Sequence, residues 1–169
     1  RIEKDLGNAL ISRYQYYADL YILRKIEYDE YCKYEQMIKV LFPSHDVVVK
    51  SIEKVSKYYQ SQSAYIEGMD LQKQGLIEKA IDSYRQVMFN DQIYYDLAKA
   101  KMTECVQLIK ERYLMEANEF YEQKEYIEAI KRLDYLIENG TDESVNSLKW
   151  YYQSEFYIEA MKTIENLIE

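Results

Sequence analysis

Apolar and polar residues follow one another along this chain with the spacing of an α-helix. In its first part, apolar side chains recur at intervals of three, four or seven positions, which places them on one helical face: Leu6, Leu10, Tyr14, Tyr17, Tyr21, Tyr28, Tyr31, Ile38 and Leu41. Pro43 disfavours helical backbone in Phe42, so the first helix is predicted to end there. Ser44 or Asp46 can cap a second helix that continues to about Lys73. Residues 1–60 are therefore predicted to form a long helical hairpin.

A short pattern then recurs three times, and each copy predicts a turn followed by a new helix. The copies are Gln74-Gly75-Leu76-Ile77-Glu78-Lys79-Ala80-Ile81, Lys124-Glu125-Tyr126-Ile127-Glu128-Ala129-Ile130, and Phe156-Tyr157-Ile158-Glu159-Ala160-Met161. The last two agree closely, because Tyr126–Lys131 and Tyr157–Lys162 differ only where Met161 replaces Ile130. Such self-similarity indicates supersecondary units that stack on one another.

One long helix is predicted between the first two copies. Asn90-Asp91 can end one helix and cap the next, and the pattern then continues without a break from Gln92 to Gln123. Asn139-Gly140 is predicted to end the following helix, with glycine in its usual C-terminal place, and Thr141-Asp142 to open the next. In all, five to seven helices are expected.

Residues 61–169 resemble the tetratricopeptide repeat, a two-helix unit. The resemblance rests on small and large residues at fixed places: Gly68, Leu71, Gly75, Ile77, Ala80 and Tyr84 in the first copy, Ala117, Phe120, Lys124, Tyr126, Ala129 and Leu133 in the second, and Tyr157, Ala160 and Ile164 in the third. It implies an all-α, right-handed superhelix of about two and a half units, on which residues 1–60 pack. Gly68 or Ala117 would let Ala80 or Ala129 approach closely. The spacing departs from the family's repeat of about 34 residues. The first two copies are farther apart than this, and the last two are closer together.

The resemblance places a binding surface on the concave face, formed by the first helix of each unit. The family's positions fall on Tyr65, Met69, Gln72 and Lys73 in the first unit, on Leu114, Asn118 and Tyr121 in the second, and on Lys149 and Tyr152 in the third. Aromatic and amide side chains are typical of surfaces that hold peptides. An alternative stays open, in which Tyr65 and Leu114 face the N-terminal helices and these fill the groove.

Composition supports a helical fold and excludes several functions. With 4 Gly and 1 Pro the chain lacks the turn residues of an all-β protein. The 20 Tyr residues suit half-buried packing, and they also suit a binding surface. The net charge of −8 argues against nucleic acid as a partner. Residues 61–169 carry 12 Lys or Arg against 21 Asp or Glu, which favours a basic partner or a solvated acidic surface.

Catalytic and metal-binding patterns are missing from the sequence. His45 is the single histidine, and it has no orienting carboxylate or nucleophile at a legible spacing. Cys32 and Cys105 lack the spacing of a metal site and are expected to be small core residues, although the sequence leaves a disulfide between them open. We therefore predict no enzyme, no metal and no cofactor.

Location is predicted from a second, weaker resemblance. The run Asp96-Leu97-Ala98-Lys99 and the pair Glu104-Cys105 are similar to a group of proteins of low-GC Gram-positive bacteria, in which tetratricopeptide-like units follow a membrane anchor outside the cell. That resemblance implies an extracytoplasmic domain anchored through a segment upstream of Arg1, with a cytoplasmic location as the alternative. No run of apolar residues in the sequence is long enough to span a membrane.

The predicted function is a scaffold that holds a protein or peptide partner on its concave face. The sequence does not identify this partner. A sensory or regulatory domain that closes on a peptide is one alternative. A self-associating module is another, because Trp150 lies near an incomplete C-terminal unit, and a homo-oligomer stays open.

Overall fold

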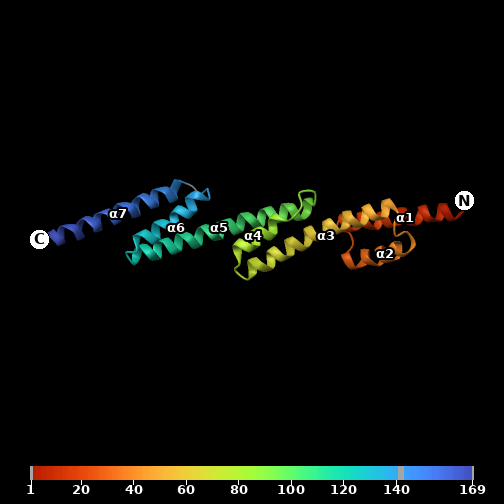
Figure 1. Cartoon of the computed structure of the whole chain (residues 1–169), viewed down its shortest axis with the longest axis horizontal. Helices are drawn as coiled ribbons and strands as arrows, with labels where there is room; N and C mark the ends of the chain where they lie inside the picture. Colours follow the sequence, from red (N-terminus) through yellow and green to blue (C-terminus); the bar gives the residue numbers. More distant parts are fainter. Residues whose placement is uncertain (1, 141–142, 169) are drawn as a thin grey trace. The chain divides into compact units, whose positions relative to one another are not determined.

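The computed structural model describes residues 2–140 and 143–168, and these form seven α-helices (Figure 1). The all-α prediction is confirmed, because no strand occurs in this part of the chain. The helices are α1 (Ile2–Ile22), α2 (Tyr28–Leu41), α3 (Asp46–Lys73), α4 (Ile77–Arg85), α5 (Gln92–Glu122), α6 (Tyr126–Glu138) and α7 (Glu143–Ile168). The predicted helix opening at Thr141-Asp142 has its first residues outside the described ones.

Contacts divide the chain into two compact units, residues 1–103 (unit 1) and residues 104–169 (unit 2). The sequence pattern placed a domain boundary at residue 60. Within unit 1, α1 packs on both α2 and α3, and α3 packs on α4. Within unit 2, α6 packs on α7. Helix α5 is one uninterrupted helix, as predicted from its apolar pattern, and it contributes residues to both units.

The predicted first helix is wrong, because the chain turns back at residues 23–27. Arg24 adopts a left-handed backbone conformation with φ of +56°, which an α-helix does not accommodate. The turn brings the two halves of the apolar stripe face to face. Tyr14 of α1 and Tyr31 of α2 are both buried, and their hydroxyl oxygens lie 2.5 Å apart. The apolar spacing did not reveal this turn, because the buried residues of α1 and α2 follow one another at the same intervals.

The same turn closes three helices of the chain. Arg24, Gly75 and Lys124 all have positive φ, at 56°, 76° and 62°. In each turn the next residue's N–H donates to the carbonyl five residues earlier: Lys25 to Leu20 at 2.8 Å, Leu76 to Leu71 at 3.0 Å and Glu125 to Phe120 at 2.9 Å. A second bond joins the left-handed residue to the carbonyl three residues earlier. This pair of bonds is the Schellman motif, which ends a helix and satisfies its last carbonyls.

The four small residues predicted at helix contacts are all buried. Ala80, Ala117 and Ala129 are fully buried, and Gly68 is buried as well. A Cβ added to Gly68 would lie 2.5 Å from Cε1 of Tyr84, so α4 lies against the bare backbone of α3. The nearest neighbour of Gly68 is thus the ring of Tyr84, and not Ala80 as the pattern predicted.

The predicted turn before Tyr157 does not form, since α7 runs without interruption from Glu143 to Ile168. The third copy has Leu148 in the place that Gly68 and Ala117 hold in the other two. Leu148 packs against the core of unit 2. A helix folded back at Tyr157 would therefore bring Ala160 against a large side chain instead of a small one.

Helix starts also differ from the predicted caps. His45 holds the N-cap position of α3 and makes no side-chain capping bond, so neither Ser44 nor Asp46 caps this helix. Asp91 precedes α5, and its carbonyl accepts from the N–H of Tyr95 at 2.8 Å. The Asp91 side chain, however, bonds to Arg24. Helix α6 ends as predicted at Asn139-Gly140, where Gly140 has a φ of +84°.

Candidate functional site

A polar cluster of unit 1 surrounds Arg24, in the turn between α1 and α2. Its Nη2 atom lies 2.5 Å from Oδ2 of Asp91 and donates to the carbonyl of Tyr58 at 3.2 Å, while Nη1 donates to Oε1 of Gln62 at 3.2 Å. The Arg24 side chain is 14% exposed and that of Asp91 is 2% exposed. A buried carboxylate of this kind needs a cation beside it, and Arg24 provides one.

Aromatic rings enclose the same guanidinium group. Its carbon lies 4.7 Å from the ring centre of Tyr94, 5.0 Å from that of Tyr21 and 5.9 Å from that of Tyr58. Burial raises the pKa of Tyr21, and the charge of Arg24 opposes that rise. Gln62 completes the cluster, because it accepts from the Tyr21 hydroxyl at 2.9 Å and donates to the Tyr94 hydroxyl at 3.0 Å.

This cluster is suited to hold unit 1 together. Both terminal nitrogens of Arg24 are occupied, and Nε is buried without a hydrogen-bond partner among the residues that the structure describes. The cluster joins the α1–α2 turn to α3 and to the start of α5. Sequence reasoning missed the turn that carries Arg24. The residues around it nevertheless repeat: Asp19-Leu20 and Ile26-Glu27 have the same spacing as Asp70-Leu71 and Ile77-Glu78 around the next turn.

The predicted binding residues of unit 1 do not form an open surface together. Tyr65 is buried, with its ring centre 5.8 Å from that of Tyr84 and 5.1 Å from that of Tyr94. Gln72 accepts from the Tyr84 hydroxyl at 2.9 Å, so it secures α4. The remaining two are Met69, which is half-buried, and Lys73, which is exposed and pairs with Asp70 at 3.3 Å.

In unit 2, three of the predicted residues contact one another across α5 and α7. The rings of Tyr121 and Tyr152 stack with centres 4.2 Å apart and an interplanar angle of 12°. The Tyr152 hydroxyl donates to Oδ1 of Asn118 at 3.4 Å, and the hydroxyls of Tyr121 and Tyr151 are 3.0 Å apart. We call Asn118, Tyr121, Tyr151 and Tyr152 the tyrosine face. Tyr151 was not among the predicted residues.

The other two predicted residues of unit 2 lie beside this face. Leu114 packs against the core that contains Ala117, Leu133 and Tyr152. Lys149 turns to α6, where its Nζ lies 2.5 Å from Oδ1 of Asp134. Leu114 therefore packs in the same core as Tyr152 of the tyrosine face. The charge of Lys149 is paired with a carboxylate of the neighbouring helix.

The carboxylates of Glu122 and Glu155 lie near the tyrosine face. The hydrogen bond to Tyr151 raises the pKa of Tyr121, and burial and the charge of Glu155 raise it further. Burial raises the pKa of Tyr152, with a smaller contribution from the charge of Glu122. Tyr121 and Tyr152 therefore keep their phenolic protons, which can donate hydrogen bonds.

Unit 1 has an apolar groove of about 330 Å³ between α1 and α2, which sequence reasoning did not foresee. Tyr17 and Tyr34 form one wall and stack with ring centres 3.5 Å apart. The other lining residues are Leu10, Arg13, Tyr14, Met37, Ile38 and Leu41. Cys32 packs against the core of this unit, and Cys105 is buried in unit 2, as expected of small core residues.

Residues 2–140 and 143–168 hold no group of three or more His, Cys, Asp or Glu side chains that could bind a metal ion. His45 is exposed, with its ring 6.4 Å from that of Phe42. Within the same residues, none of the helices has both the length and the apolar character needed to cross a membrane. Compared with protein-family models, with curated proteins and with solved structures, the chain matches none of them.

Proposed function

We propose that this chain is a non-enzymatic scaffold that binds a protein or peptide on the tyrosine face of unit 2. The observation that supports this most is that ring surface, phenolic hydroxyls and an amide occur together on one face. Tyr151 is 50% exposed and Asn118 is exposed, while the Tyr121–Tyr152 stack fixes the rings behind them. Rigid aromatic side chains supply contact area at low entropic cost, and amides bond to the backbone of an extended peptide.

The proposed scaffold is a tetratricopeptide-like array of helical hairpins wound as a right-handed superhelix. Two features support it. The hairpin turns at Arg24, Gly75 and Lys124 share one hydrogen-bond pattern. The small residues Gly68 and Ala117 are buried at corresponding places of α3 and α5. The first hairpin, α1–α2, would then be a further unit of the same kind, which the sequence analysis did not count.

The partner proposed for this face carries positive charge. Glu122 and Glu155 lie close enough to the tyrosines to raise their pKa values, and Glu122 is exposed. Lys149, the nearest predicted cation, is paired with Asp134. A peptide with Lys or Arg beside an apolar side chain would match both the charge and the rings.

The test is selection of linear peptides from a random displayed library on the wild-type chain, followed by calorimetric titration of the enriched peptides. We expect basic peptides to enrich, and Asn118→Ala and Tyr151→Ala each to weaken their binding by about tenfold or more, as residues at the centre of an interface do. Both side chains are exposed, so the fold should survive, which far-ultraviolet circular dichroism checks.

Phe89→Ala is the matched control, since Phe89 is a large, exposed ring in unit 1. It should leave the affinity of the enriched peptides unchanged. Failure to enrich any peptide, or equal affinity in the wild type and both face variants, would refute the proposed surface. The absence of catalysis and the location outside the cell stay predictions.

A further inference from the structure

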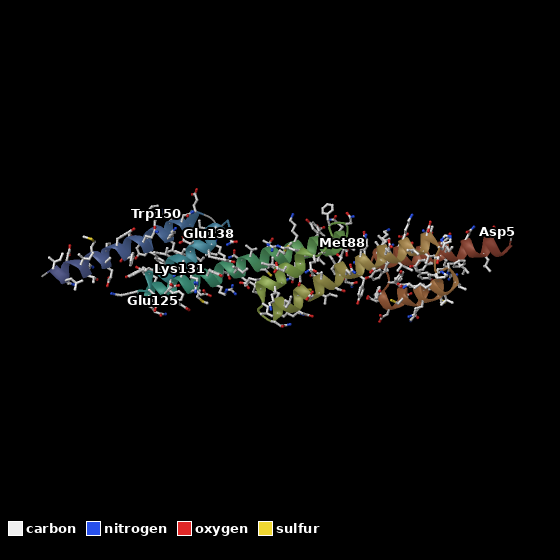
Figure 2. The ribbon with its side chains drawn as sticks, in the orientation of Figure 1. Asp5, Met88, Glu125, Lys131, Glu138 and Trp150 are labelled. Carbon is white, nitrogen blue, oxygen red and sulfur yellow. The ribbon has the colours of Figure 1, made fainter. Side chains whose placement is uncertain are left out.

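Tyr17 of α1 and Tyr34 of α2 stack face to face across the first hairpin. Their ring centres lie 3.5 Å apart, and the two ring planes make an angle of 12°. Both side chains are half-buried, so the stack is accessible from solvent. Figure 2 draws the side chains that fill the space between the ribbons of these two helices. Rings so close and so nearly parallel overlap over most of their area, which brings ring carbons of the two residues into van der Waals contact.

No other stacked pair of tyrosines in the described part of the chain is as close. The ring centres of three further pairs lie 4.0, 4.2 and 4.3 Å apart, in Tyr28–Tyr59, Tyr121–Tyr152 and Tyr113–Tyr135. Tyr14 and Tyr31 have adjacent hydroxyls, but their ring centres are 5.9 Å apart with an interplanar angle of 37°, and both residues are buried. Close ring contact and access from solvent therefore coincide at Tyr17 and Tyr34.

The hydroxyl groups of the stack also lie next to each other. The Tyr34 hydroxyl lowers the pKa of Tyr17, and Arg13 lowers it further. The same contact with Tyr17 raises the pKa of Tyr34. When the hydroxyls are adjacent and the rings overlap, the Cε atoms beside each hydroxyl-bearing carbon face one another as well. A phenol releases its proton when it loses one electron, so the lowered pKa makes Tyr17 easier to oxidise.

We propose that Tyr17 and Tyr34 form an oxidative modification site, at which hydrogen peroxide and a haem peroxidase join the two rings as dityrosine. Each phenol gives up one electron and one proton, which leaves a radical shared between its oxygen and its Cε atoms. A carbon–carbon bond forms between one Cε atom of each ring, and the hydrogens on these two carbons move to the phenolic oxygens. The peroxide takes up the two electrons and the two protons and leaves as two molecules of water.

The fold favours this coupling in two ways. The stack holds the reacting carbons in contact before oxidation, so the two radicals combine without diffusing together. The groove of about 330 Å³ that both tyrosines line leaves space in which the rings can turn about the new bond. The product connects α1 to α2 across the turn at residues 23–27. A link of this kind restricts the unfolded chain, so the crosslinked hairpin should resist unfolding.

Peptide mapping by mass spectrometry tests the proposal. The wild-type chain is oxidised at low concentration, and the monomer is recovered from a denaturing gel and digested with trypsin, which cuts after Lys and Arg. Tyr17 is then released in residues 14–24, and Tyr34 is the only tyrosine of residues 34–39. We expect these two peptides as a linked pair whose mass is their sum less two hydrogens. Oxidation of Met37 in the second peptide adds oxygen, which its mass distinguishes.

Two variants assign the link to its residues. Tyr17→Phe and Tyr34→Phe keep a ring in the stack but lack the phenol, so the linked pair should fall to background in each. Tyr157→Phe removes a tyrosine that is 67% exposed and should leave the yield unchanged. Absence of the linked pair from the wild-type monomer, while free tyrosine is converted to dityrosine in a parallel reaction, would overturn the proposal. Persistence of the pair in Tyr17→Phe or Tyr34→Phe would also overturn it.

Thermal unfolding measures what the link does to the hairpin. The crosslinked wild-type monomer should unfold about 5–10 °C above the untreated chain. Tyr34→Phe after the same treatment should unfold at the temperature of its untreated form. A linked monomer with an unchanged unfolding temperature would show that the bond does not constrain α1 against α2.

Discussion

Arg24 and Asp91 lie 67 residues apart in sequence and form an ion pair of 2.5 Å in the interior of unit 1. The pair connects the turn after α1 with the residue before α5.

Replacing Asp91 should be far more damaging than replacing a surface carboxylate. Asp91→Ala leaves Arg24 buried without its counter-charge, and removing one partner of a buried pair costs about 3–5 kcal/mol of unfolding free energy. Urea denaturation followed by circular dichroism measures the loss. Asp70→Ala breaks an exposed pair with Lys73 and should cost about 1 kcal/mol or less. Equal losses in the two variants would contradict a structural role for the Arg24 cluster.

Adding one methyl group should have opposite effects at Gly68 and at Gly7. Gly68→Ala places a Cβ 2.5 Å from the Tyr84 ring, and overpacking of this kind costs about 1–3 kcal/mol. At Gly7, in α1, a Cβ would meet the Phe42 ring at 3.4 Å, which is ordinary contact. Gly7→Ala should therefore gain up to about 1 kcal/mol from helix propensity. Thermal unfolding measures both, and a stabilised Gly68→Ala variant would disprove the close packing of α3 on α4.

Removing glycine from one hairpin turn and introducing it into another should change the free energy of unfolding in opposite directions. Gly75→Ala meets no atom within 4 Å, so its cost comes from the positive φ alone and should be about 1 kcal/mol. Lys124→Gly relieves the same strain and gives up an exposed ion pair with Glu159 at 2.8 Å, which is worth little. It should be neutral or stabilising by up to about 1 kcal/mol. Chemical denaturation of both variants checks the sign, and two destabilised variants would count against equivalent turns.

Stability should fall in alkaline solution because buried phenols resist ionisation. Burial raises the pKa of Tyr14 to about 12, and burial together with the bond to Tyr14 raises the pKa of Tyr31. An unfolded tyrosine ionises near pH 10. Above about pH 10 the unfolded chain therefore binds fewer protons than the folded one, and the free energy of unfolding decreases as pH rises toward 12. Below about pH 9 these groups contribute no pH dependence.

Denaturation at a series of pH values from about 8 to 11 measures this decrease. Tyr14→Phe removes one of the shifted groups, so its stability should start lower and fall less steeply than that of the wild type. Tyr16→Phe changes an exposed ring of the same helix and should keep the wild-type slope. Parallel curves for Tyr14→Phe and the wild type would show that Tyr14 is not protected by the fold.

Most of the helices could be predicted from apolar spacing, but the turn at Arg24 could not. The spacing of apolar residues indicates which residues are buried. It can stay regular across a hairpin turn when the two helices bury their residues against each other, as Tyr14 and Tyr31 do. The turn lacks Gly and Pro, so it had no compositional mark. At Tyr157 the opposite happened, where a repeated pattern predicted a turn and α7 stayed helical.

The proposed binding surface could be predicted only in part for a related reason. The family's positions identify residues on one side of a helix. Three of the residues chosen in this way, Asn118, Tyr121 and Tyr152, contact one another. The family's positions could not show that Tyr65 is covered by Tyr84 and Tyr94, because that depends on side chains from two later helices. Tyr151 was missed since its contact with Tyr121 depends on how α7 is rotated against α5.

The 31-residue helix α5 has a practical consequence for dissecting the protein. A cut at the border between residues 103 and 104 would sever it in mid-course, leaving several main-chain carbonyls and amides at each new end without partners. A separately expressed C-terminal fragment should therefore start at Gln92, and an N-terminal one should extend to Glu122. Fragments cut at the border should fray at the new ends, which amide hydrogen exchange would reveal as rapid exchange over the first or last turns.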